Sequence, residues 1–140
     1  MFPMHPRTHA RLADLDASAI PSSARLLLIE PLDYFDFLGL MMGEAVVITD
    51  SGGVQKETTF LGMPCVTVRT TTERPVTVTS GTNTLADPHD RAAILAAVYD
   101  AVGKGPAVPA PVIPLWDGHA GDRAVDALAR WAAAREGATV

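Results

Sequence analysis

The chain has 140 residues, of which 48% are apolar and 6% aromatic, and its formal net charge is −5. This length suits one domain with a buried core, and the acidic balance argues against non-specific nucleic-acid binding, which needs a basic surface. The single cysteine, Cys65, cannot form an internal disulfide. The N-terminus does not resemble a signal peptide and no apolar run approaches a membrane span, so we expect a cytoplasmic protein that binds no membrane.

Short apolar runs alternate with helical patterns along the first hundred residues. Strands are predicted at 26–29, 46–48, 65–68 and 83–85, and helices at 34–42, 54–61 and 87–102. The last of these helices is predicted to begin at Asp87-Pro88, an N-cap residue followed by a proline, while the residues after Pro75 are ambiguous. Strands that alternate with helices are typical of a parallel sheet with helices on both faces, so the expected fold class is α/β.

Two further parts follow this α/β region. Residues 103–116 are rich in proline and predict an extended linker. Residues 117–140 predict a C-terminal helix with Asp117 as its N-cap. The expected organisation is therefore a domain over 1–102, a linker and a final helix.

A polar turn with two glycines, Ser51-Gly52-Gly53, stands between the predicted strand at 46–48 and the helix at 54–61. In a parallel sheet such a turn lies at the carboxyl edge of the strands, where ligands bind. A helix N-terminus offers unpaired N–H groups and a partial positive charge, and small residues let a phosphate approach the backbone. The turn lacks the Gly-Lys-Ser/Thr ending of a Walker motif. An anion site and a plain strand-to-helix turn both stay open.

Three side chains could complete a nucleotide site, and each has an ordinary alternative. Glu57 lies one helical turn after Gly53 and could accept hydrogen bonds from a ribose diol, or could complement the helix dipole. Arg74 follows the next strand and could clamp a diphosphate, or could be a loop arginine paired with Glu73. Phe37 could stack on a base, or could belong to the core.

Four segments occur in one order with plausible spacing: EPLDYFDFLGLM, ITDSGGVQKETTFLGMPCVTVR, TTTERPVTVTSGTN and WDGHAGDRAVDAL. Together they resemble the C-terminal domain of the non-hydrolysing UDP-N-acetylglucosamine 2-epimerases, over nearly the whole chain. The Ser-Gly-Gly turn followed by Gln and Glu, and the Thr-Glu-Arg-Pro segment, are specific to that family. The resemblance implies a Rossmann-like three-layer domain with a parallel sheet, like the C-terminal half of a GT-B fold.

The resemblance also implies the ligand and the reaction. The family interconverts UDP-GlcNAc and UDP-ManNAc by eliminating UDP and adding it back to the other face of the sugar. The resemblance implies that no cofactor is needed. The residues that match its UDP-sugar site are Ser51, Gly52 and Gly53 for the diphosphate, Glu57 for the ribose, Arg74 for the nucleotide-sugar and Phe37 near the uracil.

The chain departs from the family's pattern at informative positions. Leu32 stands where some members have a glutamine that contacts the uracil, and Lys56 stands where many have an acidic residue. The family's proton-transferring carboxylates lie in its N-terminal domain, and its His-Arg-Arg-Glu-Asn segment is not in this sequence. Because a general base must be within reach of its proton, we expect no catalytic residue here and a missing N-terminal domain or partner chain.

Three functions compete at this point. The first is the UDP-binding part of a 2-epimerase for polysaccharide biosynthesis, inactive without its other half. The second is a stand-alone UDP-binding module or remnant, and the third is the donor domain of a GT-B glycosyltransferase. The expected partners are UDP-GlcNAc or UDP, with a homodimer also considered. No metal is expected, since His5 and His9 have no carboxylate or cysteine at ligand spacing.

Overall fold

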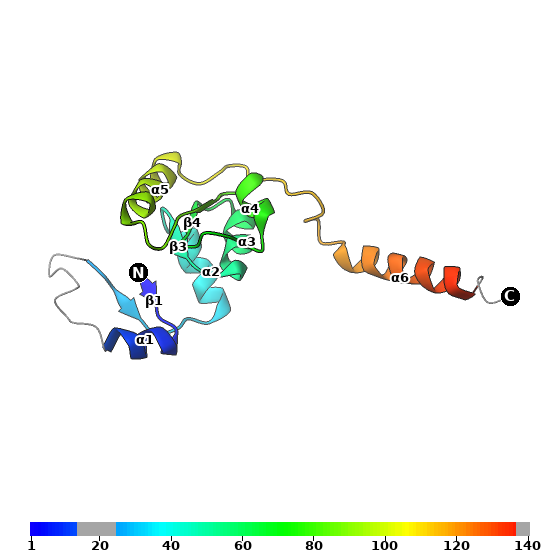
Figure 1. Ribbon diagram of the computed structural model, residues 1–140, viewed down its shortest axis with the longest axis horizontal. Helices are drawn as coiled ribbons and strands as arrows, with labels where there is room; N and C mark the ends of the chain where they lie inside the picture. Colours follow the sequence, from blue (N-terminus) through cyan, green and yellow to red (C-terminus); the bar gives the residue numbers. More distant parts are fainter. Residues whose placement is uncertain (14–24, 137–140) are drawn as a thin grey trace. The chain divides into compact units, whose positions relative to one another are not determined.

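The computed structural model describes residues 1–13 and 25–136, which form two compact units, Met1–Gly43 and Glu44–Val140 (Figure 1). In the described residues every strand pair is parallel, and a helix lies between paired strands in the sequence. The predicted α/β fold class with parallel sheets is therefore confirmed.

In the first unit, residues 1–13 and 25–43 form a two-stranded sheet and two helices. They are β1 (Phe2–Pro3), α1 (Pro6–Ala13), β2 (Leu28–Ile29) and α2 (Tyr34–Met42). α2 spans the predicted residues because Asp33 caps it: the Asp33 carboxylate accepts a hydrogen bond from the Asp36 N–H at 2.9 Å. α1 has no counterpart among the predicted elements.

The second unit is built on a three-stranded sheet with the order β3–β4–β5. Its elements are β3 (Val47–Thr49), α3 (Gly52–Leu61), β4 (Cys65–Thr67), α4 (Pro75–Thr79), β5 (Asn83–Leu85), α5 (Arg91–Lys104) and α6 (Ala120–Glu136). Thr49, the last residue of β3, is paired with Thr67, the last residue of β4. The loops after these two strands therefore leave the sheet side by side.

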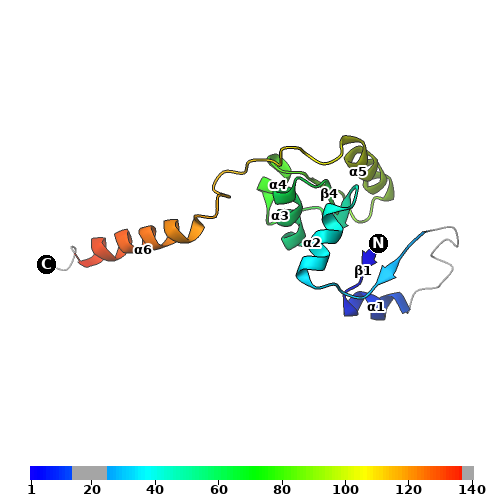
Figure 2. The same ribbon diagram turned by 180° about the vertical axis from the view of Figure 1, so that it is seen from behind.

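The two faces of β4 differ in chemistry. Val66 is fully buried in an apolar cluster with Ala86 and with Ala101 of α5. Because side chains alternate along a strand, Cys65 and Thr67 point to the opposite face, which packs against α3 and α4. Figures 1 and 2 show α5 on one side of this sheet and α3 with α4 on the other. The second unit is thus a three-layer arrangement.

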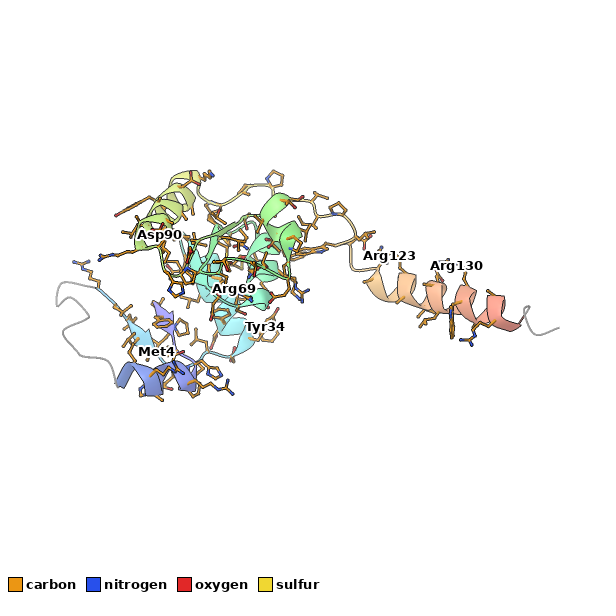
Figure 3. The ribbon with its side chains drawn as sticks, viewed as in Figure 1. Met4, Tyr34, Arg69, Asp90, Arg123 and Arg130 are labelled. Carbon is orange, nitrogen blue, oxygen red and sulfur yellow. The ribbon has the colours of Figure 1, made fainter. Side chains whose placement is uncertain are left out.

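α5 begins later than predicted. Asp87 and Pro88 belong to a separate turn, in which the Asp87 carboxylate accepts a hydrogen bond from the His89 N–H at 2.8 Å. Asp90, labelled in Figure 3, caps the helix instead, and its carboxylate accepts from the Ala93 N–H at 3.0 Å. The predicted start is wrong because both aspartates suit an N-cap, and the sequence alone does not rank them.

Two other helices also refine the sequence reading. α4 occupies the ambiguous residues after Arg74, with Pro75 at its first position. α6 begins at Ala120 rather than next to Asp117, whose carboxylate forms an ion pair with Arg123 at 2.9 Å. Hydrogen bonds from the Arg123 guanidinium and, to a smaller extent, from the His119 N–H lower the pKa of Asp117 to about 2.

The proline-rich segment after α5 contacts the body of the second unit. The Ala107 N–H donates to the Gly62 carbonyl at 2.8 Å, and Ile113 is buried. The predicted division into a domain, a linker over 103–116 and a helix over 117–140 stays a prediction. Among the helices that the structure describes, none is long and apolar enough to cross a bilayer.

Gly62 ends α3 in the left-handed conformation, with φ 73° and ψ 13°, and an added Cβ would lie 2.5 Å from the Ala107 carbonyl oxygen. We expect Gly62→Ala to lower the free energy of unfolding by about 1–3 kcal/mol in a urea titration. Gly103→Ala is the matched control: a Cβ at Gly103 of α5 would meet nothing within 4 Å, so this variant should be neutral or more stable. Equal losses in the two variants would contradict the assigned conformation.

Candidate functional site

The glycine turn, residues 50–53, consists of the two residues between β3 and α3 and the first two residues of α3. Ser51 is the N-cap residue, and its carbonyl accepts the first helical hydrogen bond, from the Gln55 N–H at 3.3 Å. The Ser51 hydroxyl makes no capping hydrogen bond, and the N–H groups of the first helical turn have no acceptor within the helix. The start of α3 therefore presents backbone N–H donors and a serine hydroxyl at the carboxyl edge of the sheet.

The arginine loop, residues 68–74, follows β4 on the neighbouring strand. Arg69, labelled in Figure 3, donates two hydrogen bonds to the Glu73 carboxylate, at 2.9 and 3.1 Å. These hydrogen bonds are the main reason why the pKa of Glu73 is lowered. Arg74 is exposed, and its guanidinium donates to the Glu73 carbonyl at 3.5 Å rather than to a carboxylate. The Arg74 guanidinium is thus not neutralised by the acidic residue next to it.

The glycine turn and the arginine loop contact each other. A Cβ added at Gly52 would lie 3.5 Å from Glu73 Oε2, so the Glu73 carboxylate stands beside the first residue of α3. One turn into the helix, Thr72 Oγ1 donates to Gln55 Oε1 at 2.6 Å. The structure therefore brings the Ser-Gly-Gly turn and the Thr-Glu-Arg-Pro segment to one edge of the sheet, where their positions after neighbouring strands predicted them.

Two other residues that were predicted to bind the UDP-sugar lie outside the glycine turn and the arginine loop. Glu57 lies on α3, one helical turn beyond Gly53, and is half-buried. Its carboxylate has no hydrogen-bond or ion-pair partner among the residues that the structure describes. Phe37 lies on α2 in the first unit and is also half-buried. The roles of Glu57 at a ribose and of Phe37 at a uracil stay predictions.

The groups at this edge are suited to an anionic ligand. The start of α3 supplies N–H donors and the positive end of a helix dipole, which favour a phosphate. The Arg74 guanidinium can bind a phosphate through two parallel hydrogen bonds. The Arg69 guanidinium compensates the charge of the Glu73 carboxylate beside Gly52. The Glu73 carboxylate therefore repels an anion less than an unpaired carboxylate would.

Sequence reasoning missed the buried polar side chains behind this edge. Gln55, Thr77 and Asn83 are each at most 4% exposed. Gln55 entered the sequence analysis only as a letter of the family motif, and none of the three was predicted to have a role in the site. A usable signal was the helical spacing of Gln55, Thr58 and Thr59 at i, i+3 and i+4, which places three polar residues on one buried face of α3. Periodicity of polar residues is easily read as a solvated face, and here it marks a polar interior.

A separate hollow of about 180 Å³ lies in the first unit. It is lined by Met4, Pro6, His9, Ile29 and Glu30, with Met4 labelled in Figure 3. None of the residues that were predicted to bind the UDP-sugar lines this hollow. Within residues 1–13 and 25–136, no three His, Cys, Asp or Glu side chains gather closely enough to bind a metal ion.

The fold and the site define a class of protein, an α/β domain that offers a helix N-terminus and an arginine loop to a phosphate group at the carboxyl edge of parallel strands. Comparison with protein families makes the class specific. The family model described as UDP-N-acetylglucosamine 2-epimerase matches residues 1–129. The chain therefore belongs to the UDP-N-acetylglucosamine 2-epimerase family.

Individual relatives agree with this assignment. The chain is 43% identical over 93 residues to a UDP-N-acetylglucosamine 2-epimerase of Methanococcus maripaludis, and the aligned segment covers 64% of this chain and 25% of the relative. It is 40% identical over 85 residues to a UDP-2,3-diacetamido-2,3-dideoxy-D-glucuronate 2-epimerase of Pseudomonas aeruginosa, and this aligned segment covers 61% of this chain and 23% of the relative.

Solved structures give the same result for the fold. The UDP-GlcNAc 2-epimerase of Methanocaldococcus jannaschii, in complex with UDP-GlcNAc and UDP, superimposes with a TM-score of 0.76 at 35% identity. The match covers 92% of this chain and 35% of that one. The chain thus spans between about a quarter and a third of the length of these relatives. The predicted resemblance to the C-terminal domain of this family, and the GT-B-like fold class, are confirmed.

Replacing Arg69 should raise the pKa of Glu73 toward its usual value near 4.5, since hydrogen bonds from Arg69 are the main cause of the lowering. An NMR titration of the Glu73 carboxyl carbon should report this rise in Arg69→Met. Arg74→Met is the matched control, because Arg74 contributes least to the lowering. Stability from the pair is present above pH 4.5 and is lost as the pH falls through the lowered pKa. Equal rises in both variants would overturn the assigned ion pair.

Proposed function

We propose that this chain is the UDP-binding part of a UDP-N-acetylglucosamine 2-epimerase. The observation that carries the proposal is the contact between the arginine loop and the glycine turn, made in a chain that belongs to this family. A diphosphate carries charge on several oxygens and is bound by donors that converge from more than one element. The Methanocaldococcus jannaschii neighbour, whose structure contains UDP-GlcNAc and UDP, supports the nucleotide as the ligand.

The proposed contacts follow the chemistry of the groups in the site. Backbone N–H groups at the start of α3 bind the diphosphate, and a guanidinium from the arginine loop neutralises it. A carboxylate one turn into α3 accepts hydrogen bonds from the ribose hydroxyls, and an aromatic ring of α2 packs near the uracil. The residues in these roles are Ser51, Gly52, Gly53, Arg74, Glu57 and Phe37.

The proposed reaction interconverts UDP-GlcNAc and UDP-ManNAc by elimination and re-addition of UDP. Inversion at C2 of the sugar needs groups that remove and return a proton, and these must be within hydrogen-bond reach of it. The family's His-Arg-Arg-Glu-Asn segment is not in this sequence. We therefore assign those groups to a domain or partner chain outside it, and expect the chain alone to bind UDP without turnover.

The nucleotide is the part of the substrate on which the relatives agree. By name, one relative acts on UDP-N-acetylglucosamine and another on UDP-2,3-diacetamido-2,3-dideoxy-D-glucuronate. The family description favours the N-acetylglucosamine sugar for this chain. A cytoplasmic location, a role in polysaccharide biosynthesis and a homodimer stay predictions.

Calorimetric titration with UDP tests the proposal. Arg74→Ala should weaken the affinity about tenfold or more, because it removes charge-assisted hydrogen bonds to the diphosphate. Glu57→Ala should weaken it less, since it removes bonds to neutral hydroxyls. Lys56→Ala is the matched control, because Lys56 is an exposed neighbour of Glu57 on α3 and has no proposed role. Unchanged affinity in both test variants, or no heat of binding for the wild-type chain at millimolar UDP, would contradict the proposal.

A further inference from the structure

The backbone of Arg74 is linked to buried polar side chains on both sides. Arg74 itself is exposed and precedes α4 with φ −126° and ψ 56°, outside the regular helical and extended values. The only regular hydrogen bond that holds this residue, among those of the described residues, is the one from the Thr77 N–H at the start of α4 to its carbonyl. Its peptide groups are also bound by two side chains, Thr72 of the loop at the N–H and Thr77 of α4 at the carbonyl.

On the amino side, the link passes through Thr72 to Gln55. The Arg74 N–H donates to Thr72 Oγ1 at 2.9 Å, and the Thr72 hydroxyl donates its own proton to Gln55 Oε1 at 2.6 Å. A hydroxyl has one proton and two lone pairs, so donation to Gln55 leaves the lone pairs available for the Arg74 N–H. Gln55 is completely buried on α3, and it thereby sets the orientation of the Thr72 hydroxyl.

On the carboxyl side, the link reaches the sheet. The Arg74 carbonyl accepts hydrogen bonds from the Thr77 N–H at 3.0 Å and from Thr77 Oγ1 at 2.7 Å. Asn83 Nδ2 donates to Thr77 Oγ1 at 3.3 Å, and Thr67 Oγ1 donates to Asn83 Oδ1 at 2.7 Å. Thr67, Thr77 and Asn83 are buried, so this side of Arg74 is joined to β4 and β5 by groups that water does not reach.

The amide of Gln55 shows that the arrangement is not simply the most stable one. Its Nε2 is buried and has no acceptor among the residues that the structure describes. A buried donor without a partner is destabilising, and an apolar side chain of the same shape would avoid the cost. Among the described residues, the one polar contact of the Gln55 side-chain amide is with Thr72 of the arginine loop.

We propose that Gln55 is a positioning residue for the nucleotide site, and that it acts through Thr72 to hold the Arg74 backbone in place before the ligand binds. The inference rests on the proposed role of Arg74 at the diphosphate. A loop that is already ordered loses less conformational entropy on binding, so the affinity is higher than for a mobile loop. Gln55 contributes to binding without touching the nucleotide.

Two isosteric variants separate positioning from general stability. Gln55→Met keeps the volume of the side chain, removes the acceptor for Thr72 and removes the unpaired Nε2. Thr72→Val keeps the shape of the side chain and removes the hydroxyl, whereas Thr72→Ser keeps the hydroxyl. Thr84→Val is the matched control, because Thr84 is an exposed threonine of β5 that takes no part in the hydrogen bonds linking Gln55 to Arg74.

We expect Gln55→Met and Thr72→Val to weaken UDP binding roughly threefold to tenfold, the effect of losing one hydrogen bond. Gln55→Met should keep or raise the melting temperature, while Thr72→Ser and Thr84→Val should bind as the wild type does. In an Arg74→Ala background, Thr72→Val should cause no further loss, because the group that it positions is absent. A further loss of the same size in that background would overturn the inference.

Hydrogen exchange of the Arg74 amide tests the same inference without any ligand. Gln55→Met and Thr72→Val should speed this exchange, while the exchange of amides in β4 stays unchanged. If the wild-type chain does not bind UDP but these variants speed the exchange, the proposed function fails, and of the inference only the ordering of the Arg74 backbone by Gln55 and Thr72 stands. If Arg74 exchanges equally in the wild type and both variants, the positioning role fails, whatever the affinity for UDP.

Discussion

The parallel pairing of β3 with β4 is the constraint on which the site depends. The two strands end in register, at Thr49 and Thr67, so the glycine turn and the arginine loop leave the sheet at the same edge. These segments lie about twenty residues apart in sequence, and no local signal brings them together. Their contact, seen at Gly52 and Glu73, follows from strand register. A change that shifted this register by one residue would also reverse the two faces of β4.

The division of β4 into an apolar and a polar face explains how the site is supported. Val66 packs in the apolar cluster with α5, while the Thr67 hydroxyl donates to Asn83 of β5, which in turn donates to Thr77 of α4. Burial also raises the pKa of the Cys65 thiol on this polar face, so it stays protonated at neutral pH. Buried hydrogen bonds fix directions that apolar packing leaves free. The apolar layer therefore stabilises the unit, and the polar layer orders the edge where the proposed ligand binds.

Much of this arrangement could be predicted from the sequence, and the failures have physical causes. The α/β class, α2 and the three strands of the second unit were recognisable from apolar periodicity and turn residues. The start of α5 was wrong because two aspartates offered equivalent caps. The contact of Gln55 with Thr72 was not predicted because the two residues lie 17 positions apart, and only tertiary packing joins them. The roles of Glu57 and Arg74 at UDP do not follow from the fold, because the same backbone could present these side chains to solvent.

The central claim is that the glycine turn and the arginine loop form one phosphate site. The most direct measurement is NMR of the backbone amides of the chain during a titration with UDP. The account predicts that the amides of Gly52, Gly53 and Arg74 shift together and follow a single binding curve. Shifts confined to the residues that line the hollow of the first unit, or separate curves for the turn and the loop, would contradict it.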